Sequence, residues 1–366
     1  MKGINKILKK AEDSEEISQA EALMLLKVTG KDFFTLQQAA DQICFEKKKD
    51  FVTFVVNRNI NFTNICYQGC KFCSFSVSKK NEESFVKTHE EIRADVIDAK
   101  KIGCTEVCIQ GGINPELDFD FYLNILRAVK EIDSNMHTHA FSPQEVFHMA
   151  KIYDNSIENV LKELIRAGLD SMPGTAAEIL VDDIRKVICP NKISTSQWIE
   201  IIKKAHNLGI PTTSTMMYGH IETLQHRIEH LQVLRNIQAE TSGFTEFVPL
   251  PFVSVNPVLS KLTEYPLKAS YGMADLKLFA VARLFFNNYI DNIQCSWVKL
   301  GPKFAQVSLN FGVNDFSGTL MEENISKSAG ADFGEYLTPE KIIDIIRSAG
   351  KHPAQRDTLY HILEYH

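Results

Sequence analysis

The chain has 366 residues, of which 44% are hydrophobic and 23% charged, and this composition excludes long disordered, collagen-like and fibrous structures. Its net charge of −6 provides no bulk positive field to hold a phosphate backbone, so we expect no nucleic-acid partner. No apolar run approaches the roughly 18 residues of a membrane span, and the amino terminus lacks the apolar core of a secretory signal. The sequence therefore predicts a cytoplasmic protein without a membrane partner.

The elements expected along the chain divide it into three parts. Apolar side chains at helical spacing predict a helical amino-terminal segment over 1–50. From residue 51 onward, short runs rich in β-branched and aromatic residues alternate with longer helical stretches. The predicted strands are 51–64, 104–110, 136–142, 169–172, 211–217, 244–250, 293–298 and 314–319. The predicted helices lie near 88–102, 117–132, 143–166, 195–208, 222–240, 272–288, 302–311 and 338–349.

Eight such alternations predict an α/β fold, a (β/α)8 TIM-type barrel over 51–350, with a carboxyl-terminal tail over 351–366 that packs on it. Alternation alone also fits a doubly wound open sheet. Polar residues at the ends of the strands favour the barrel, because catalytic groups of this fold gather there. The strand ends are Asn64, Gln110, Ser142, Pro173, Tyr218, Pro249 and Thr319, and all but the two prolines are polar.

Three of the eight cysteines, Cys66, Cys70 and Cys73, fall close together with the spacing C-x3-C-x2-C, just after the first predicted strand. Three thiolates can hold three irons of a 4Fe–4S cluster and leave the fourth iron open to a substrate. A structural zinc site would normally need a fourth ligand, for which only His89 lies near. Three unrelated buried cysteines would not require this spacing. The window therefore predicts an open cluster, and the other five cysteines are expected to be packing residues.

Four side chains near the predicted strand ends are candidates for moving protons: His139, Tyr218, His220 and Glu246. His139 shares a strand face with His137, and a neutral imidazole there can accept a proton. A lone histidine on a strand is, however, more often a satisfied structural group. The sequence does not rank the four.

The motif formed by Cys66, Cys70, Phe72 and Cys73 resembles that of the radical S-adenosylmethionine (SAM) superfamily, whose members carry C-x3-C-x-aromatic-C after the first strand of a barrel. The resemblance implies a 4Fe–4S cluster and SAM as cofactors. It further implies that SAM binds the open iron and is cleaved, by one electron, to methionine and a 5′-deoxyadenosyl radical that abstracts hydrogen.

The same resemblance implies further contacts to SAM, each with a structural alternative. The backbone of Phe72 would face the adenine, and its ring could instead merely shield the cluster. Gln110, Gly111 and Gly112 would receive the SAM amino group, although Ile113 departs from the commonest form of this element. An ordinary glycine turn is the alternative. Asp170 or Glu178 would accept the ribose hydroxyls; Glu178 could equally be an acid in the first turn of a helix.

Nearly the whole chain resembles one branch of that superfamily, the deazaflavin and menaquinone-precursor enzymes. Shared segments include VVNRNINFTNIC, HAFSPQEV, AGLDSMPGTAAEIL, GIPTTSTMMYGHIET and QRDTLY. The segments VICPNK, FTEFVPLPFV, SWVKLGP and NDFSGTLMEE look most like the tyrosine-using half of deazaflavin synthases.

That resemblance implies a transferase in deazaflavin biosynthesis. Its substrates would be L-tyrosine and 5-amino-6-(D-ribitylamino)uracil, and it would add a 4-hydroxybenzyl group to the uracil and release 2-iminoacetate. A second, ring-closing radical SAM subunit and a low-potential electron donor are the implied partners. One alternative is a menaquinone-route enzyme such as cyclic dehypoxanthinyl futalosine synthase. Another is a non-catalytic iron–sulfur electron carrier, which would need a fourth nearby cysteine that the sequence lacks.

Overall fold

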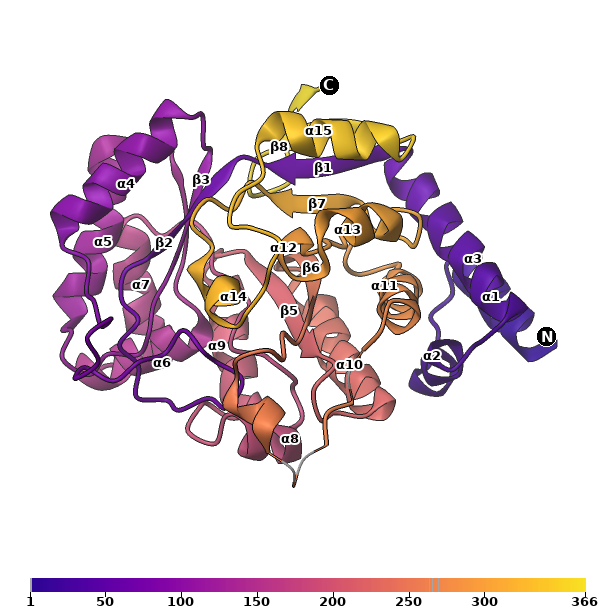
Figure 1. The fold of residues 1–366 in the computed structure, drawn as a ribbon, viewed down its shortest axis with the longest axis horizontal. Coiled ribbons are helices and arrows are strands. Elements are labelled where there is room, and N and C mark those ends of the chain that lie inside the picture. Colours follow the sequence, from indigo (N-terminus) through magenta and orange to yellow (C-terminus); the bar gives the residue numbers. More distant parts are fainter. Residues whose placement is uncertain (1, 263, 265, 269) are drawn as a thin grey trace.

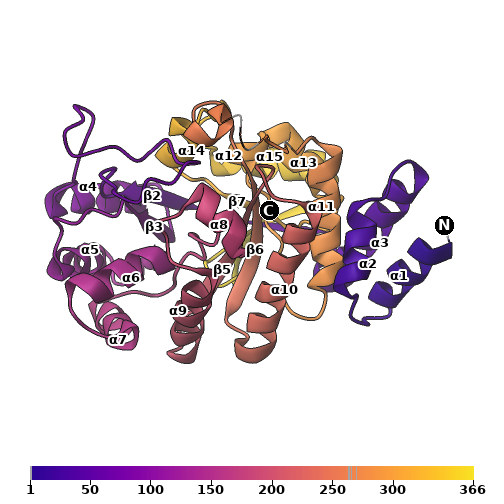
Figure 2. The same cartoon turned by 90° about the horizontal axis from the view of Figure 1, so that it is seen from below.

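A computed structural model describes residues 2–262, 264, 266–268 and 270–366. The chain begins with three helices, α1 (Lys2–Glu12), α2 (Gln19–Leu26) and α3 (Lys31–Lys48). Ser18 and Glu21 form a capping box that satisfies backbone N–H groups at the start of α2. Both α2 and α3 pack against α11 (Met273–Phe285), at one side of the molecule (Figures 1 and 2).

The strands of the structure form three sheets. In the first, β1 (Phe51–Val55) pairs in parallel with β7 (Asp315–Gly318) and β8 (His352–Arg356), and β9 (Ile362–Tyr365) runs antiparallel to β8. The second contains β2 (Asn57–Asn61), β3 (Glu106–Gln110) and β4 (His137–Ala140), and the third β5 (Thr212–Tyr218) and β6 (Phe244–Pro251). Both of these sheets are parallel.

Isolated parallel bridges connect the three sheets. Residues 171 and 172 bridge β4 to β5, and residues 293 and 294 bridge β6 to β7. The predicted strands 169–172 and 293–298 are therefore present only as single bridges. Pro173, which cannot donate to a ladder, follows the first of them, and Trp297 already begins helix α12 within the second. Residues 351–366 contribute β8 and β9.

Helices surround the strands (Figures 1 and 2). They are α4 (His89–Lys101), α5 (Phe119–Ile132), α6 (Pro143–Ile152), α7 (Ile157–Ala167), α8 (Asp182–Ile188), α9 (Thr195–Asn207), α10 (Leu224–Thr241), α11, α12 (Trp297–Leu300), α13 (Pro302–Ser308), α14 (Asn324–Ser328) and α15 (Pro339–Ser348), with a 3-10 turn at Val258–Lys261. The single helix predicted over 143–166 is two helices, because Ser156 caps a new one at α7. The architecture is α/β with mainly parallel strands inside and helices outside.

The main apolar core lies where the helices face the strands. On α7, Val160, Leu161 and Leu164 recur at helical spacing and are fully buried. Burying each such side chain contributes about 1.5–3 kcal/mol of transfer free energy. On β2 the side chains alternate, so that Ile60 packs in the core while Asn57 and Asn59 line the interior cavity described below. No helix among the described residues combines the length and apolarity needed to cross a membrane.

Candidate functional site

A cavity of about 400 Å³ lies at the centre of the strands. Every strand from β1 to β8 contributes at least one lining residue, so the cavity runs through the interior of the strand arrangement. Loops after β2, β3 and the 171–172 bridge complete its wall. Cavities of this size hold cofactors and small substrates.

The three motif cysteines lie at one end of this cavity, on the loop that follows β2. Gly69 has a φ of +63°, a conformation that favours glycine, and it lets the loop turn between the first two cysteines. The N–H of Lys71 donates to the carbonyl of Ile188 at 2.8 Å, and the carbonyl of Lys71 accepts from Leu259 N–H at 2.8 Å. Backbone hydrogen bonds to two other segments therefore fix the loop.

The end of β3 lies directly against this loop. A Cβ atom on Gly112 would stand 2.3 Å from the carbonyl oxygen of Ile65, and one on Gly111 would stand 2.5 Å from the ring of Phe62. Only glycine permits this approach at either position. The N–H of Gly111 donates to Oε1 of Glu145 at 3.0 Å, and Glu145 also forms a capping box with Ser142 at the start of α6. Burial raises the pKa of Glu145 to about 7.

Two partly buried lysines line the same end of the cavity. Lys192 Nζ lies 2.6 Å from Oε1 of Glu178 and 5.3 Å from the centre of the Phe72 ring. Lys299 donates to Ser326 Oγ at 2.7 Å. Burial raises the pKa of the Cys70 thiol, whereas the charge of Lys192 acts in the opposite direction. We call Cys66, Cys70, Cys73 and the two lysines the cysteine end of the cavity.

The cysteine end fits a 4Fe–4S cluster held by three thiolates. Its thiols share one wall of the central cavity, and the lysine charges offset the negative charge that bound thiolates would bring. In the part of the chain that the structure describes, no three His, Cys, Asp or Glu side chains converge as a site for a single metal ion requires.

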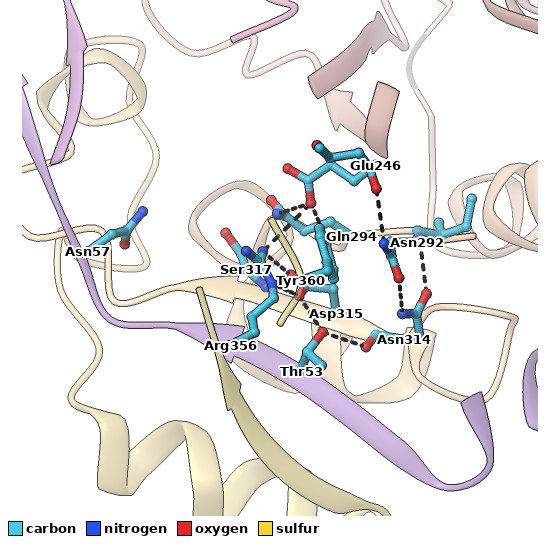
Figure 3. Close-up of polar contacts among 12 residues, drawn as sticks. Thr53, Asn57, Glu246, Asn292, Gln294, Asn314, Asp315, Ser317, Arg356 and Tyr360 are labelled. Carbon is cyan, nitrogen blue, oxygen red and sulfur yellow. Dashed lines mark hydrogen bonds and ion pairs between the residues drawn. The ribbon is translucent and has the colours of Figure 1, made fainter. Parts of the chain in front are cut away.

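A second group of charged residues lies elsewhere on the cavity wall and directly behind it; we call Glu106, Glu246, Asp315 and Arg356 the carboxylate end. Oε1 of Glu106 accepts a hydrogen bond from Asn57 at 2.9 Å. Arg356 contacts both oxygens of Asp315, with Nε at 2.5 Å and Nη2 at 3.1 Å. Glu246 accepts from Gln294 at 2.8 Å, and most of this network is drawn in Figure 3.

Burial shifts the pKa values of two side chains at or beside the carboxylate end, Glu246 and His139. Burial raises the pKa of Glu246 to about 7, although the nearby Arg356 charge opposes the rise. Burial lowers the pKa of His139 to about 4, so its imidazole is neutral at ordinary pH. His139 Nδ1 lies 2.7 Å from the hydroxyl of Ser171, which His137 also contacts. At neutral pH the carboxyl of Glu246 can therefore both hold and accept a proton.

Most of the residues that the sequence proposes for the site line this one cavity. They are Cys66, Cys70, Phe72, Cys73, Gln110, Gly111, Gly112, His139, Glu178 and Glu246. Cys108, expected to be a packing residue, also lines it, because it shares a strand face with Gln110.

The structure places three proposed site residues outside this cavity. Tyr218 follows Met217, which lines the cavity, so its side chain points to the opposite face of β5. There it is fully buried, with the Arg227 guanidinium 5.0 Å from the ring centre. His220 is also fully buried, 3.1 Å from the carbonyl of Met217.

Asp170 is the third residue outside the cavity. Its Oδ2 lies 2.5 Å from Lys130 Nζ and accepts from the N–H of Thr138 at 2.8 Å. Asp170 precedes the 171–172 bridge, at the amino end of that segment, whereas the cysteine loop follows the carboxyl end of β2. The geometry supports a structural tie between α5 and β4, and gives no support to a contact with SAM.

Sequence reasoning did not single out several charged residues that line the cavity: Glu106, Glu145, Lys192, Lys299 and Arg356. Glu106 could have been found from strand periodicity, since it lies two and four residues before the other lining residues of β3. Lys192 and Arg356 lie in the segments VICPNK and QRDTLY, whose resemblance to the family does not by itself show that these two side chains line a cavity.

Residues 60–234 match the family described as the radical SAM superfamily, and residues 241–366 match the CofH/MqnC C-terminal region. A protein of Archaeoglobus fulgidus is 54% identical over 89% of this chain and 92% of its own length. One of Methanothermobacter thermautotrophicus is 51% identical over 98% and 97%. Both relatives are named 5-amino-6-(D-ribitylamino)uracil--L-tyrosine 4-hydroxyphenyl transferase.

Solved structures with a similar fold include two enzymes of low sequence identity. The FeFe-hydrogenase maturase HydG from Carboxydothermus hydrogenoformans aligns with a TM-score of 0.77 at 14% identity, over 98% of this chain and 80% of its own. Methylornithine synthase (PylB) aligns with a TM-score of 0.74 at 16% identity, over 95% and 97%. These likenesses establish the TIM-type α/β fold.

The sequence motif, the fold and the residues that line the cavity all fit the same superfamily. The cofactors of the matched superfamily are a 4Fe–4S cluster and SAM, and the three cysteines of its motif lie together on the wall of a central cavity. The similarity to curated relatives extends over nearly the full length of the chain. The chain therefore belongs to the radical SAM superfamily, in the branch that carries the CofH/MqnC C-terminal region.

Proposed function

We propose that the chain is a transferase that joins the 4-hydroxybenzyl group of L-tyrosine to 5-amino-6-(D-ribitylamino)uracil, with release of 2-iminoacetate, in deazaflavin biosynthesis. The observation that carries this proposal is the 54% identity, over nearly the full length of both chains, to a relative that bears the name of this transferase.

At the cysteine end, Cys66, Cys70 and Cys73 would hold the cluster, and Phe72, Gln110, Gly111, Gly112 and Glu178 would contact SAM. When bound, the cluster and SAM supply a radical that removes hydrogen from the substrate. Lys192 and Lys299 stabilise the thiolate charge, and Glu178 keeps Lys192 in place through their 2.6 Å ion pair.

Between the two ends, the cavity wall suits an aromatic ring and a polyhydroxylated chain. Val248, Leu250 and Val298 are apolar lining residues that can pack against a phenol ring and exclude water. Asn59, Thr213 and Ser317 offer amide and hydroxyl groups to the ribityl chain and the pyrimidine.

Proton transfer is assigned to the carboxylate end. Glu246, whose pKa burial raises to about 7, would take a proton from the substrate. His139 stays neutral because burial lowers its pKa to about 4, and it can serve as a hydrogen-bond partner or a second acceptor. Tyr218 and His220 are not included, since they lie outside the cavity.

The bridges at 171–172 and 293–294 support a closed eight-membered (β/α) circuit, with 1–50 as a helical segment and 351–366 as a carboxyl-terminal segment packed on it.

The ring-closing radical SAM subunit and a low-potential electron donor would be the partners. We place the reaction in the cytoplasm, because an open cluster requires a reducing compartment.

The test is mass spectrometry of products after the reduced, reconstituted enzyme is incubated with SAM, L-tyrosine and the ribitylaminouracil. The proposal predicts a hydroxybenzyl adduct of the uracil that depends on all three compounds. Absence of the adduct contradicts it. Product from dehypoxanthine futalosine would support the menaquinone-route alternative. Reduction of the iron–sulfur cluster without cleavage of SAM would support a non-catalytic electron carrier.

A further inference from the structure

The two oxygens of the Glu246 carboxylate have different surroundings. Oε2 accepts hydrogen bonds from the hydroxyl of Tyr360 and from Nε2 of Gln294 at 2.8 Å. The Arg356 guanidinium lies 3.7 Å from the same oxygen. The contacts of Oε2 are drawn in Figure 3. The structure gives Oε1 no hydrogen bond to any described residue, and Glu246 lines the cavity. The carboxylate is therefore held through one oxygen while the other is available.

Tyr360 reaches this site from the segment after β8 and does not itself line the cavity. The turn that carries it is tied by Asp357, whose carboxylate accepts the N–H groups of Leu359 and His361 at 2.9 Å each. The guanidinium carbon of Arg356 lies 4.0 Å from the centre of the Tyr360 ring. These contacts fix the hydroxyl against Glu246.

The charges around Glu246 favour a cation in front of Oε1. Charged or titratable groups face it from the elements around it: Glu106 from β3, Asp315 from β7, Arg356 from β8 and Tyr360 from the turn that follows. Arg356 binds both oxygens of Asp315 and also lies 3.7 Å from Oε2 of Glu246, so this one guanidinium faces the carboxylates of Asp315 and Glu246, and Glu106 adds a third carboxylate. His139 on β4 adds no charge, because burial lowers its pKa. A substrate ammonium would restore the balance.

We propose that Glu246 binds the ammonium of the amino-acid substrate through Oε1 and accepts its proton, and that Tyr360 and Gln294 are positioning residues that hold Oε2. In this step the N–H bond of the ammonium breaks, an O–H bond forms on Oε1, and the amine becomes neutral without any change of oxidation state. This inference rests on the proposed function for its choice of an amino-acid substrate.

The first test follows the Glu246 carboxyl itself, in the reconstituted enzyme without substrate, by infrared difference spectroscopy against pH. Glu246→Gln identifies the band. Tyr360→Phe removes a donor that stabilises the ionised form, so the titration should move upward by about one pH unit. Tyr289→Phe is the matched control, because Tyr289 donates to Glu16 in a similar Tyr–Glu pair at the protein surface. It should leave the titration unchanged.

The second test measures binding by calorimetry to the oxidised holoenzyme with SAM, where no turnover occurs. L-Tyrosine is compared with 3-(4-hydroxyphenyl)propionate, which lacks the amine. Wild type should prefer L-tyrosine by at least about tenfold. Glu246→Gln should lose this preference, and Tyr360→Phe should retain it only at higher pH. Gln294→Leu, which removes the other donor, should act in the same direction and replaces Tyr360→Phe if that variant does not fold.

An unchanged carboxyl titration in both Tyr360→Phe and Gln294→Leu overturns the inference. So does an undiminished preference for L-tyrosine in Glu246→Gln, or a wild-type enzyme that shows no preference. Failure of the proposed function would give a different result: the wild-type enzyme would recognise the ammonium and yet form no adduct with the ribitylaminouracil.

Discussion

The cysteine end of the cavity has its three sulfur atoms on one short loop, whereas the carboxylate end is assembled from β3, β6, β7 and β8. Three cysteines within eight residues can be recognised without knowing the fold, because local chain geometry brings them together. Glu106 and Arg356 are 250 residues apart and line the same cavity only when the strands assemble. The two ends also differ in charge, with lysines beside the thiols and an excess of carboxylates at the other end.

This contrast suggests a division of roles, in which the cysteine end generates the radical and the carboxylate end handles the substrate. Changes at the two ends should then have separable effects.

Cys70→Ala should have the largest effect. Loss of one of three thiolate ligands should reduce iron content from about four atoms per chain to near none and abolish SAM cleavage. Iron analysis and anaerobic assay of 5′-deoxyadenosine check this. Cys44→Ala, which changes a buried thiol outside the cavity, is the control and should keep its iron. Retention of cleavage by Cys70→Ala would disprove the assignment.

Gly112→Ala should be the next most damaging. The added Cβ would stand 2.3 Å from the Ile65 carbonyl and 3.0 Å from the Cβ of Cys66, so the cysteine loop must move. We expect a loss of about 1–3 kcal/mol in the free energy of unfolding and weaker SAM binding. Chemical denaturation and equilibrium binding measure both. Gly3→Ala, where no atom lies within 4 Å of the added Cβ and the position is helical, should lower neither the free energy of unfolding nor the affinity for SAM.

Lys192→Met should make the cluster harder to reduce, because a positive charge near the thiolates favours the more negative, reduced state. We expect the midpoint potential to fall by about 60 mV, which corresponds to a tenfold change in a one-electron equilibrium. Redox titration followed by electron paramagnetic resonance measures it. Lys192→Arg retains the charge, so its midpoint potential should stay close to that of the wild type. A midpoint potential in Lys192→Met equal to that of the wild type would contradict the assignment.

Asp170→Asn should have the smallest effect on activity. Its carboxylate binds Lys130 and the N–H of Thr138 away from the cavity, so the free energy of unfolding should fall by about 1–2 kcal/mol. The dissociation constant of SAM should stay within about twofold of wild type. Glu178→Gln, at the cysteine end, should weaken SAM binding. A tenfold or greater loss of SAM affinity in Asp170→Asn would restore Asp170 to the SAM site.

The same contrast explains how much of the molecule could be predicted from its sequence. Local patterns predicted the α/β class, most of the strands and the cysteine loop. Periodicity could not show that 169–172 and 293–298 pair only through single bridges, because pairing depends on neighbours distant in the chain. Tyr218 was proposed for its place at a strand end and Asp170 as a carboxylate for the ribose of SAM, yet the face of β5 and the partner Lys130 decide where their side chains lie. Arg356 was missed because its role depends on Asp315, 41 residues earlier.

The division of roles is tested most directly by Glu246→Gln, in which 5′-deoxyadenosine and the hydroxybenzyl adduct are quantified in the same reaction. The account predicts that the variant keeps its cluster and still cleaves SAM slowly without coupling, while adduct formation falls by about 100-fold or more. Equal loss of both products, or adduct formation at the wild-type rate, would contradict it.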